Sequence, residues 1–404
     1  MGAKKTDYQK TVRACYLGTI TQSVVLNVTP ILFLPLAACY GLSFEQLGRL
    51  VLVNFVCQFV SDLAFARPVE RWGIRPFVVG GHACTALGLI LFSAAPLLFP
   101  NHIYFGLLLA TALFSSGGGL LELLLNPIMS ALPGDDTARR LSLMHSCYGW
   151  GHIAVALIST LLIFALGRER WFVVPLLWSL LPLVNCLNFA RAPLVQMIEE
   201  QQRTRLGTLL RRPFFVLCLG AMFFNGAIEV TMSQWASSFL EQSIGLPKVM
   251  GDTLGVCMYA AMMAVGRLLY AKFGQQVDVF RLMLWGAVLC GGCYLVAGLS
   301  GLPVFCLLAC AACGFGVSIM WPACVAIAAD TYPLAGASMF ALVSGFGDAG
   351  SAIGPWGVGM IADTASNGLQ TGLAAASVFA IGMWICTYYL RAHYRAERQV
   401  TIGE

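Results

Sequence analysis

Charged side chains are scarce in this sequence. Of its 404 residues, 11% are charged and 58% are hydrophobic, and the mean hydropathy is +0.78. Soluble domains carry about 25% charged residues. Long polar stretches are lacking as well, because the two tails (1–10 and 392–404) and the central gap (192–212) are short. These absences argue against a soluble catalytic domain and indicate a protein that crosses a membrane many times.

Several functional signals are also missing. Met1–Lys10 is polar and the apolar run after it is too long for a signal peptide, so we expect the first helix to insert itself. The 15 cysteines lie scattered in apolar runs without metal-ligand spacing, which favours buried hydrophobic side chains over disulfides. We find no nucleophile–base pair and no phosphate loop. The sequence therefore predicts no enzyme activity, no cofactor and no metal site.

Apolar runs of about 20 residues, each long enough to span the hydrocarbon core, recur along the chain. They lack the alternation of barrel strands. We predict an all-α membrane protein with twelve transmembrane helices. The expected helices cover residues 11–39, 44–66, 76–99, 102–130, 141–166, 171–191, 213–241, 250–272, 279–299, 303–330, 338–362 and 371–391.

The two halves of the chain show weak internal similarity. Asn126-Pro127 recurs as Trp321-Pro322 after 195 positions, and Asn27 corresponds to Glu229 after 202. Matches in the same order at nearly constant offsets indicate two parallel repeats. The expected domains are an N-terminal six-helix half (1–191), a polar cytoplasmic linker (192–212) and a C-terminal six-helix half (213–404).

Basic residues predict the orientation of these helices. If both termini are cytoplasmic, 20 of the 24 Lys and Arg residues fall on the inner side. The other four are Arg49, Arg168, Arg170 and Lys248. The same positive loops account for the net charge of +5, so no nucleic-acid partner is needed. Short loops without targeting extensions favour a bacterial inner membrane.

One apolar stretch, Ser115–Ser130, carries a carboxylate and an amide within a helix that should cross the membrane. Glu122 and Asn126 are four residues apart and therefore share a helix face. A bare carboxylate facing lipid is costly, so this face is expected to point into a protein interior or a water-filled cavity. The preceding glycines, 117–119, would let another helix approach closely. We predict that Glu122 is the polar centre of the protein.

Other polar residues in the apolar runs are weaker candidates. His145, Tyr148 and His152 share one helix face, and Glu229 follows Asn225 by one turn. Each could instead be an interhelical tie or a packing residue. The rings of Trp235 and Trp321 could stack on a sugar or simply pack, and Asp348 could be a gate. Asp62 and Asp330, near helix ends, are expected to be solvated.

The junction after the second helix reads Ala66-Arg-Pro-Val-Glu-Arg-Trp-Gly-Ile-Arg75. It resembles the signature loop of the major facilitator superfamily, Gly-x-Leu-Ala-Asp-Arg-x-Gly-Arg-Lys, with Ala66 in place of the first Gly and Glu70 in place of the Asp. The resemblance implies that this loop latches one conformation at the cytoplasmic face. The residues expected to act in gating are Glu70, Arg71, Gly73, Arg75 and Asp348.

Three further segments resemble the fucose permease-type sugar/proton symporters of that superfamily. Leu121–Pro127 resembles their Leu-Glu-Thr-Ala-Ala-Asn-Pro, and Leu141–Gly151 their Leu-Asn-x-x-His-x-x-x-Gly-x-Gly. Phe224–Glu229, followed by Trp235, resembles their Gly-x-Glu segment with a later Trp. By this resemblance Glu122 would be a protonatable carboxylate and Asn126 a cavity residue.

One departure concerns the first helix, where Asn27-Val28 stands in place of the Asn-Asp pair of fucose permease. Glu229 is therefore the candidate for a second proton site beside Glu122. The residues expected to bind substrate are Gln22, Asn27, Glu122, Asn126, His145, Tyr148, His152, Asn225, Glu229, Trp235 and Trp321.

The resemblance implies a secondary active transporter that moves a small polar solute, a sugar or polyol, by proton symport and alternating access. The expected partners are this solute, protons and the lipid bilayer, and the expected state is a monomer. Two alternatives stay open. One is a facilitator or exporter of a cationic or amphipathic compound, and the other is a non-transporting receptor or scaffold.

Overall fold

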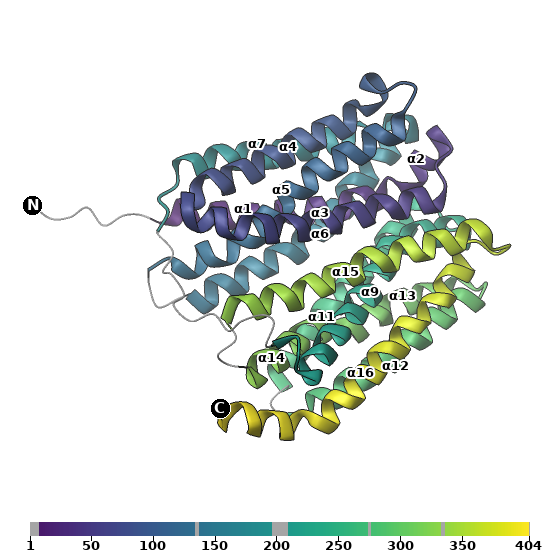
Figure 1. Cartoon of the computed structure of the whole chain (residues 1–404). Coiled ribbons are helices and arrows are strands. Elements are labelled where there is room, and N and C mark those ends of the chain that lie inside the picture. The colour runs from purple at the N-terminus through teal and green to yellow at the C-terminus, as the bar shows by residue number, and fades with distance from the viewer. Residues whose placement is uncertain (1–7, 134–136, 196–208, 274–275, 333–335, 404) are drawn as a thin grey trace, which may run out of the picture. The chain divides into compact units, whose positions relative to one another are not determined.

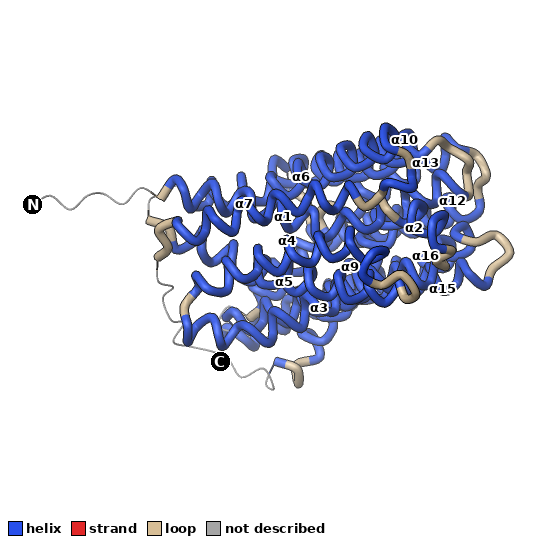
Figure 2. The backbone as a smooth tube through the Cα atoms, turned by 90° about the horizontal axis from the view of Figure 1, so that it is seen from above, coloured by secondary structure: helices blue, strands red, loops and turns tan. Residues whose placement is uncertain are grey.

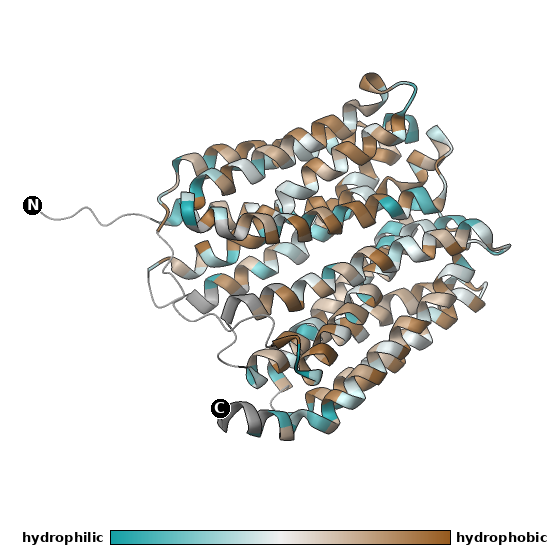
Figure 3. Cartoon of the chain, viewed as in Figure 1, coloured by the Kyte–Doolittle hydropathy of each residue, from teal (hydrophilic) through white to brown (hydrophobic). Residues whose placement is uncertain are grey.

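The structure is a computed structural model that describes residues 8–133, 137–195, 209–273, 276–332 and 336–403. Every secondary-structure element within these ranges is a helix (Figure 2). Apolar residues cover the long helices, and polar residues gather towards helix ends and connections (Figure 3). A helix satisfies its backbone groups within its own segment, which is the requirement for crossing lipid.

The first half of the chain forms eight helical segments (Figure 1). They are α1 (Gln9–Ile31), α2 (Phe33–Tyr40), α3 (Phe44–Trp72), α4 (Ile74–Leu98), α5 (Ile103–Ala131), α6 (Thr137–Leu166), the short η1 (Arg168–Arg170) and α7 (Val173–Arg191).

The second half forms another set of helical segments. They are α9 (Pro213–Gln242), α10 (Lys248–Met250), the π-helix η2 (Gly251–Cys257), α11 (Met258–Phe273), α12 (Val279–Leu299), α13 (Pro303–Val317), α14 (Met320–Thr331), α15 (Gly336–Thr364) and α16 (Leu369–Gly403).

The described helices match the predicted transmembrane segments closely. Ten spans are long and apolar enough to cross a membrane, and the bent pair α1–α2 makes up to 11. The remaining segment, α15, is 29 residues long but carries polar and small residues along its length. With α15, the described residues contain the twelve predicted segments. The membrane-spanning, all-α class expected from the sequence is therefore confirmed.

Two predicted helices are broken where proline removes a backbone donor. The bend between α1 and α2 is 44° and lies at Leu32. Pro35 has no N–H to offer the carbonyl of Ile31, so the helical bonding pattern fails there. Likewise α13 ends and α14 begins around Ser318, whose carbonyl would need a donor from Pro322. The sequence analysis expected both segments to be continuous.

Residue contacts divide the chain into two compact units. Unit 1 comprises 1–42 and 53–199, and unit 2 comprises 43–52 and 200–404. The first residues of α3 thus group with unit 2, and the rest of α3 groups with unit 1. The domain boundaries expected from the sequence stay a prediction, and residues 196–208 of the expected linker lie outside the described residues.

The triple-glycine segment of α5 is the packing centre of unit 1. A Cβ at Gly118 would lie 2.7 Å from Cγ1 of Val25 on α1, and one at Gly119 would lie 2.7 Å from the backbone oxygen of Gln58 on α3. A Cβ at Gly117 would clash with the backbone of α4. Each glycine therefore admits a different neighbouring helix, and the close approach expected from the sequence is confirmed.

A buried polar network ties α1, α4 and α7 together. Nδ1 of His82 donates to the carbonyl of Val78 at 2.8 Å, since a carbonyl can only accept. Nε2 must then accept, and the side-chain amide of Asn185 donates to it at 2.8 Å. The same amide also donates to the carbonyl of Ala14 at 2.9 Å. His82 and Asn185 are fully buried, so these bonds satisfy groups that would otherwise be costly in the core.

In unit 2, small residues bring the backbones of α9 and α15 into contact. A Cβ at Gly226 of α9 would clash with the carbonyl of Gly347, and one at Gly350 of α15 would clash with the carbonyl of Phe223. Small residues at such crossings are typical of helices that pack inside membranes. This contact sets the position of the polar residues that flank it on both helices.

Candidate functional site: acidic side chains on membrane-spanning helices

Glu122 lies in the C-terminal half of α5, inside the span Ile103–Ala131. Its side chain is half-buried and interacts with Gln22 of α1. Asn126 follows one turn later on α5 with an exposed side chain. The structure thus brings together Gln22 and Glu122, two of the residues expected to bind substrate.

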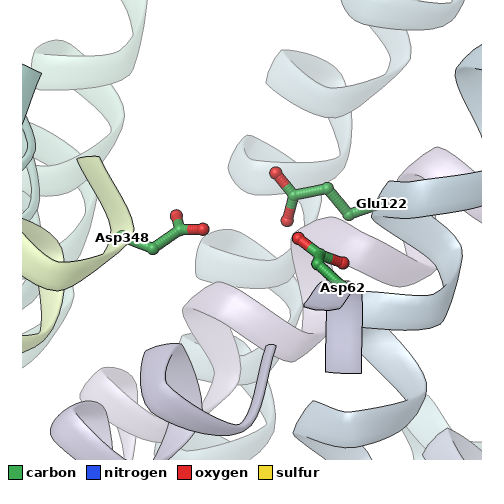
Figure 4. Close-up of side chains that lie close together, drawn as sticks. All are labelled: Asp62, Glu122 and Asp348. Atoms are coloured by element: carbon green, nitrogen blue, oxygen red, sulfur yellow. The ribbon is translucent and has the colours of Figure 1, made fainter. Parts of the chain in front are cut away.

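Asp62 of α3 points towards Glu122 (Figure 4). A carboxylate oxygen of each lies within 4.8 Å of the other. The Oδ1 atom of Asp62 is buried and has no hydrogen-bond partner among the described residues. The expectation of a solvated Asp62 is therefore wrong, because α5 covers this turn of α3.

The proximity of these two acids has an energetic consequence. Two ionised carboxylates at this distance repel each other by about 3 kcal/mol at an effective dielectric constant of about 20. Within the described parts of the chain, neither acid forms an ion pair with Lys or Arg. Nothing charged among the described residues therefore offsets this repulsion.

Gly119 determines how close the two acids come. Its hydrogen faces the backbone of Gln58, where a Cβ would lie 2.9 Å from the Cα atom of Gln58. Asp62 follows Gln58 by one helical turn, and Glu122 follows Gly119 by three residues. A side chain at position 119 would separate α3 from α5, and the two carboxylates with them.

A row of polar side chains on the buried face of α3 ends at Asp62, beside Glu122. The amide of Asn54 donates to the carbonyl of Val25 on α1 at 3.0 Å. The amide nitrogen of Gln58 donates to Oδ1 of Asn54 at 2.9 Å. Asn54, Gln58 and Asp62 stand on successive turns, so one face of α3 is polar over this part of the helix.

The other candidates of unit 1 lie on α1 and α6. Asn27 is buried, and its amide donates back to the carbonyl of Ser23 at 2.9 Å. The hydroxyl of Ser23 donates to the backbone carbonyl of Tyr148 on α6 at 2.8 Å. His152 is buried on α6, whereas the side chain of His145 is exposed. A role of these residues in substrate binding stays a prediction.

In unit 2, Glu229 of α9 faces a basic residue. Its Oε1 atom lies 4.0 Å from Nη2 of Arg267 on α11, and Oε2 is buried without a hydrogen-bond partner among the described residues. The hydroxyl of Tyr259 donates to the backbone carbonyl of Glu229 at 2.8 Å. Asn225, one turn earlier on α9, is fully buried. The charge of Glu229 is thus offset within its own unit.

Arg267 is held in place by the break between α13 and α14. Its Nε atom donates to the carbonyl of Ser318 at 3.2 Å. Pro322 cannot supply the N–H that this carbonyl would accept in a regular helix. The break therefore creates the acceptor that orients Arg267 beside Glu229.

The remaining candidates of unit 2 lie on α9, α14 and α15. Trp235 is fully buried, its indole N–H donates to the carbonyl of Pro355 at 2.9 Å, and its ring meets Phe44 edge-on. The half-buried ring of Trp321 packs against Gly347. Asp348, the next residue of α15, is 5% exposed. Their expected roles stay predictions.

The signature loop adopts the expected tight turn. Gly73 separates α3 from α4 with a φ of +82°, a conformation that other residues rarely adopt. Arg75 donates to three carbonyls at the end of α7, those of Phe189, Ala190 and Ala192. Cations suit a helix C-terminus because the helix dipole is negative there.

For the other two gating candidates of the signature loop, Arg71 and Glu70, the structure shows no contact among the described residues that supports a role. Arg71 is exposed, and the side chain of Glu70 lies outside the described residues. A gating role of the loop stays a prediction.

The sequence analysis assigned no role in the site to two residues, Asp62, which it expected to be solvated, and Arg267. Both lie near predicted cytoplasmic ends, where charged residues are common, so their positions gave no signal by themselves. The spacing of Asn54, Gln58 and Asp62 at four-residue intervals could have revealed a polar face on α3. Nothing in the sequence around Arg267 pointed to Glu229.

This combination defines a class of protein. Long membrane-spanning helices carry inward-facing acids and glycine-mediated crossings, and no soluble domain accompanies them in the described part of the chain. Intramembrane acids of this kind mark solute or ion pathways. The architecture is that of a membrane transporter rather than an enzyme.

Comparison with known families makes the assignment specific. The Major Facilitator Superfamily profile matches residues 15–277. The chain belongs to this superfamily. No curated protein matches the sequence.

Solved structures of transporters resemble the whole chain. A bacterial homologue of the human lysosomal transporter Spinster shows a TM-score of 0.75 at 15% identity, covering 98% of each chain. The nucleoside transporter NupG shows 0.71 at 13%, covering 95% of this chain and 98% of its own. A variant of the Escherichia coli fucose:proton symporter FucP shows 0.64 at 13%, covering 95% and 99%. At these identities the likeness establishes the fold.

Proposed function

We propose that this chain is a secondary active transporter that moves a small polar solute, a sugar or polyol, by proton symport with alternating access. The observation that carries the proposal is the Glu122 carboxylate. It lies within a membrane span beside the uncharged Gln22, and no Lys or Arg of the described residues pairs with it. Among proteins of similar fold are a fucose:proton symporter and a nucleoside transporter, which supports a hydroxyl-rich solute.

In the proposed cycle, protonation of Glu122 removes a buried charge. Protonation and solute binding together let the halves change their orientation around the site, since moving an ionised carboxylate through the apolar region would be costly. Gln22, Asn27 and Asn126 would offer amide groups to solute hydroxyls.

Glu229 is the second proposed proton site. Arg267 already offsets its charge at 4.0 Å, so a proton would have to compete with this guanidinium. We propose that the proton and the Arg267 guanidinium alternate as partners of Glu229. Arg267 pairs with Glu229 in one state and releases it when the carboxylate is protonated. This assigns a coupling role to a residue that could otherwise be a structural tie.

The remaining elements of the proposal concern the membrane and the gate. The positive-inside bias supports cytoplasmic termini, and the short loops support a bacterial inner membrane. Arg75, which holds the end of α7, Gly73 and Asp348 are the proposed gating residues, with Arg71 and Glu70. A monomer is the proposed functional state.

A second candidate function is transport of an organic cation, by facilitation or export. The observation in its favour is the acidic pair of Asp62 and Glu122, whose two negative charges would attract an amine. Arg267 beside Glu229 opposes a cation at that second carboxylate. A thermal-shift screen of the purified protein against sugars, polyols, amino acids and organic cations separates the two, because a bound ligand stabilises the folded state.

The solute found in that screen allows a direct test of proton coupling. In proteoliposomes with an imposed pH gradient, Glu122→Gln should abolish accumulation but retain exchange of labelled solute, because exchange does not require the proton to leave. Glu169→Gln, an exposed glutamate of η1, is the matched control and should behave as the wild type. Unchanged pH-driven accumulation by Glu122→Gln would contradict the proton role of this residue.

A further inference from the structure

The helices α12 and α16 lie side by side and antiparallel in unit 2. A Cβ at Gly298, late in α12, would clash with Ala374, early in α16, whereas one at Gly291 would lie 3.3 Å from the Cβ of Ala380. The start of α12 therefore lies beside the end of α16 (Figure 1). Both helices are long and apolar enough to span a membrane, and large apolar side chains stay exposed on both, so we expect lipid to cover these faces.

Aromatic rings mark where this lipid-facing surface ends. Trp285 of α12 is 72% exposed, and the rings of the exposed Trp384 and Tyr388 of α16 stack with their centroids 5.5 Å apart. Trp and Tyr gather at the level of the lipid head groups. The 35 residues of α16 make it about 52 Å long, against about 30 Å of hydrocarbon, so its last turns extend past this level.

Two arginines share one carboxylate just beyond these rings. Asp278 caps α12, since its Oδ1 atom accepts the backbone N–H of Phe280 at 3.0 Å. Its Oδ2 atom lies 3.1 Å from Nη2 of Arg391 on α16 and 3.6 Å from Nε of Arg281 on α12. Two positive charges meet one negative charge there, and the N-terminus of α12 adds the positive end of a helix dipole. This group of three side chains therefore keeps an excess of positive charge.

Contacts on another face hold the end of α16 in place. The ring of Tyr394 lies 5.2 Å from that of Phe280, and its hydroxyl donates to the carboxylate of Asp330 on α14. The hydroxyl of Tyr332 donates to the carboxylate of Glu397 at 2.9 Å. The last turns of α16 are thus anchored, and these two further acids are bonded to tyrosine hydroxyls.

One exposed face of α16 joins the aromatic rings to the arginines. Its exposed side chains recur at intervals of three or four residues and are Trp384, Tyr388, Arg391 and Arg395. Such spacing places them on one side of a helix. On α12, Arg281 precedes the exposed Trp285 by one turn. Each helix therefore presents an aromatic ring at the membrane boundary and an arginine one or two turns farther out.

We propose that these faces of α12 and α16 bind the head group of an anionic phospholipid. Arg281 and Arg391 donate to its phosphate, because a guanidinium matches two phosphate oxygens with parallel N–H groups. Trp285 and Trp384 lie beside the upper parts of its acyl chains. The excess positive charge selects an anionic lipid over a zwitterionic one. This inference goes beyond the proposed solute transport and does not depend on it.

The first test is native mass spectrometry of the full-length protein in detergent. Dioleoylphosphatidylglycerol and dioleoylphosphatidylcholine are titrated separately, since they share their acyl chains and differ in head-group charge. The variants are Arg281→Gln and Arg391→Gln, singly and together. Arg170→Gln, at an exposed position of η1 in unit 1, removes one positive charge elsewhere and is the matched control.

We expect the wild type to retain one phosphatidylglycerol more strongly than phosphatidylcholine. Each single variant should weaken this binding about fivefold and the double variant about twentyfold, because each basic residue near a lipid surface contributes about fivefold. Arg391→Lys keeps the charge but loses the paired N–H groups, so it should retain part of the affinity. Without added lipid, every variant should unfold within about 2 °C of the wild type, because the altered side chains are exposed.

A second measurement locates the bound lipid. Vesicles of phosphatidylcholine contain a minor fraction of a lipid that carries bromine on its upper acyl chain, where it quenches nearby tryptophans. Brominated phosphatidylglycerol should quench the wild type more than brominated phosphatidylcholine at the same fraction. The double arginine variant should lose this excess, and Trp285→Phe should reduce it.

Three results would overturn the proposal. They are equal binding of the two lipids by the wild type, equal losses in Arg170→Gln and the two arginine variants, and displacement of phosphatidylglycerol by millimolar inorganic phosphate. The last result would indicate a site for soluble anions instead of a lipid. Exchange of labelled solute tests the transport proposal separately, so either proposal can fail while the other stands.

Discussion

The ion pair of Glu229 and Arg267 is the most consequential contact between single residues in unit 2. Its two atoms are 4.0 Å apart, beyond hydrogen-bonding distance, and the Arg267 side chain is 47% exposed. A partly exposed pair contributes little to stability. The pair matters for the charge of Glu229, because a carboxylate in a membrane span keeps its charge only while a cation stays near.

Replacing Arg267 with Ala removes two interactions at once. The carbonyl of Ser318 loses its donor and Glu229 loses its counter-charge, so we expect a loss of about 1–2 kcal/mol in the free energy of unfolding. Transport should fall at least tenfold. The double variant Arg267→Ala/Glu229→Gln should recover part of the lost stability, because no uncompensated charge remains.

Denaturant or thermal unfolding of the two single variants and the double variant measures this coupling. Arg281→Ala is the control, since Arg281 forms an exposed pair with Asp278 at the start of α12. Strictly additive effects of the two substitutions on stability would contradict an energetic coupling between Glu229 and Arg267.

At the scale of elements, the crossing of α3 and α5 positions the candidate site. The two helices meet through Gly119 and the backbone of Gln58, and the acids follow directly on both helices. Backbone contact of this kind depends on the missing side chain. The geometry of the acidic pair is therefore a property of two helices together.

The substitution Gly119→Ala tests this dependence. Its Cβ would lie 2.7 Å from the carbonyl oxygen of Gln58, so the helices must separate, and we expect a loss of about 1–3 kcal/mol in stability. Transport should be weakened as well. Gly80→Ala on α4 is the control, because its Cβ would meet no atom within 4 Å.

Unfolding midpoints and uptake rates of the two glycine variants provide the comparison. Equal behaviour of Gly119→Ala and Gly80→Ala would show that α3 and α5 do not need the close crossing.

At the scale of the whole molecule, α3 is the helix shared by the two units. Residues 43–52 group with unit 2, although the rest of the helix belongs to unit 1. The carboxylate of Asp363 accepts the backbone N–H groups of Phe44 at 2.9 Å and Glu45 at 2.7 Å. The indole of Trp356 donates to the carboxylate of Glu45 at 2.8 Å. These bonds attach the first turn of α3 to the end of α15.

The substitution Asp363→Ala should loosen this attachment. A carboxylate that caps a helix N-terminus contributes about 0.5–2 kcal/mol, so amide exchange in residues 43–52 should accelerate about threefold to thirtyfold. Hydrogen exchange measured by mass spectrometry follows this segment directly. Ser366→Ala, at an exposed position three residues on, should leave exchange unchanged. Unaltered exchange in Asp363→Ala would contradict the attachment.

The sequence by itself determined the membrane class, the approximate helix ranges and the presence of an acid, Glu122, within a span. Runs of apolar residues must become helices in lipid, and a carboxylate such as Glu122 inside such a run must face the protein, whatever the neighbouring helices are. The glycine turn at Gly73 and the close packing at residues 117–119 followed from local chemistry in the same way.

Only the tertiary structure decided which residues meet. Asp62 and Glu122 are sixty residues apart, and Arg267 is far from Glu229, so no local pattern relates either pair. The breaks at Leu32 and around Ser318 also escaped the sequence analysis. An apolar run reads the same whether straight or bent, and other prolines, such as Pro127 and Pro355, lie inside continuous helices. Pairing across helices depends on crossing positions and on the faces that glycine leaves open, which a single sequence does not encode locally.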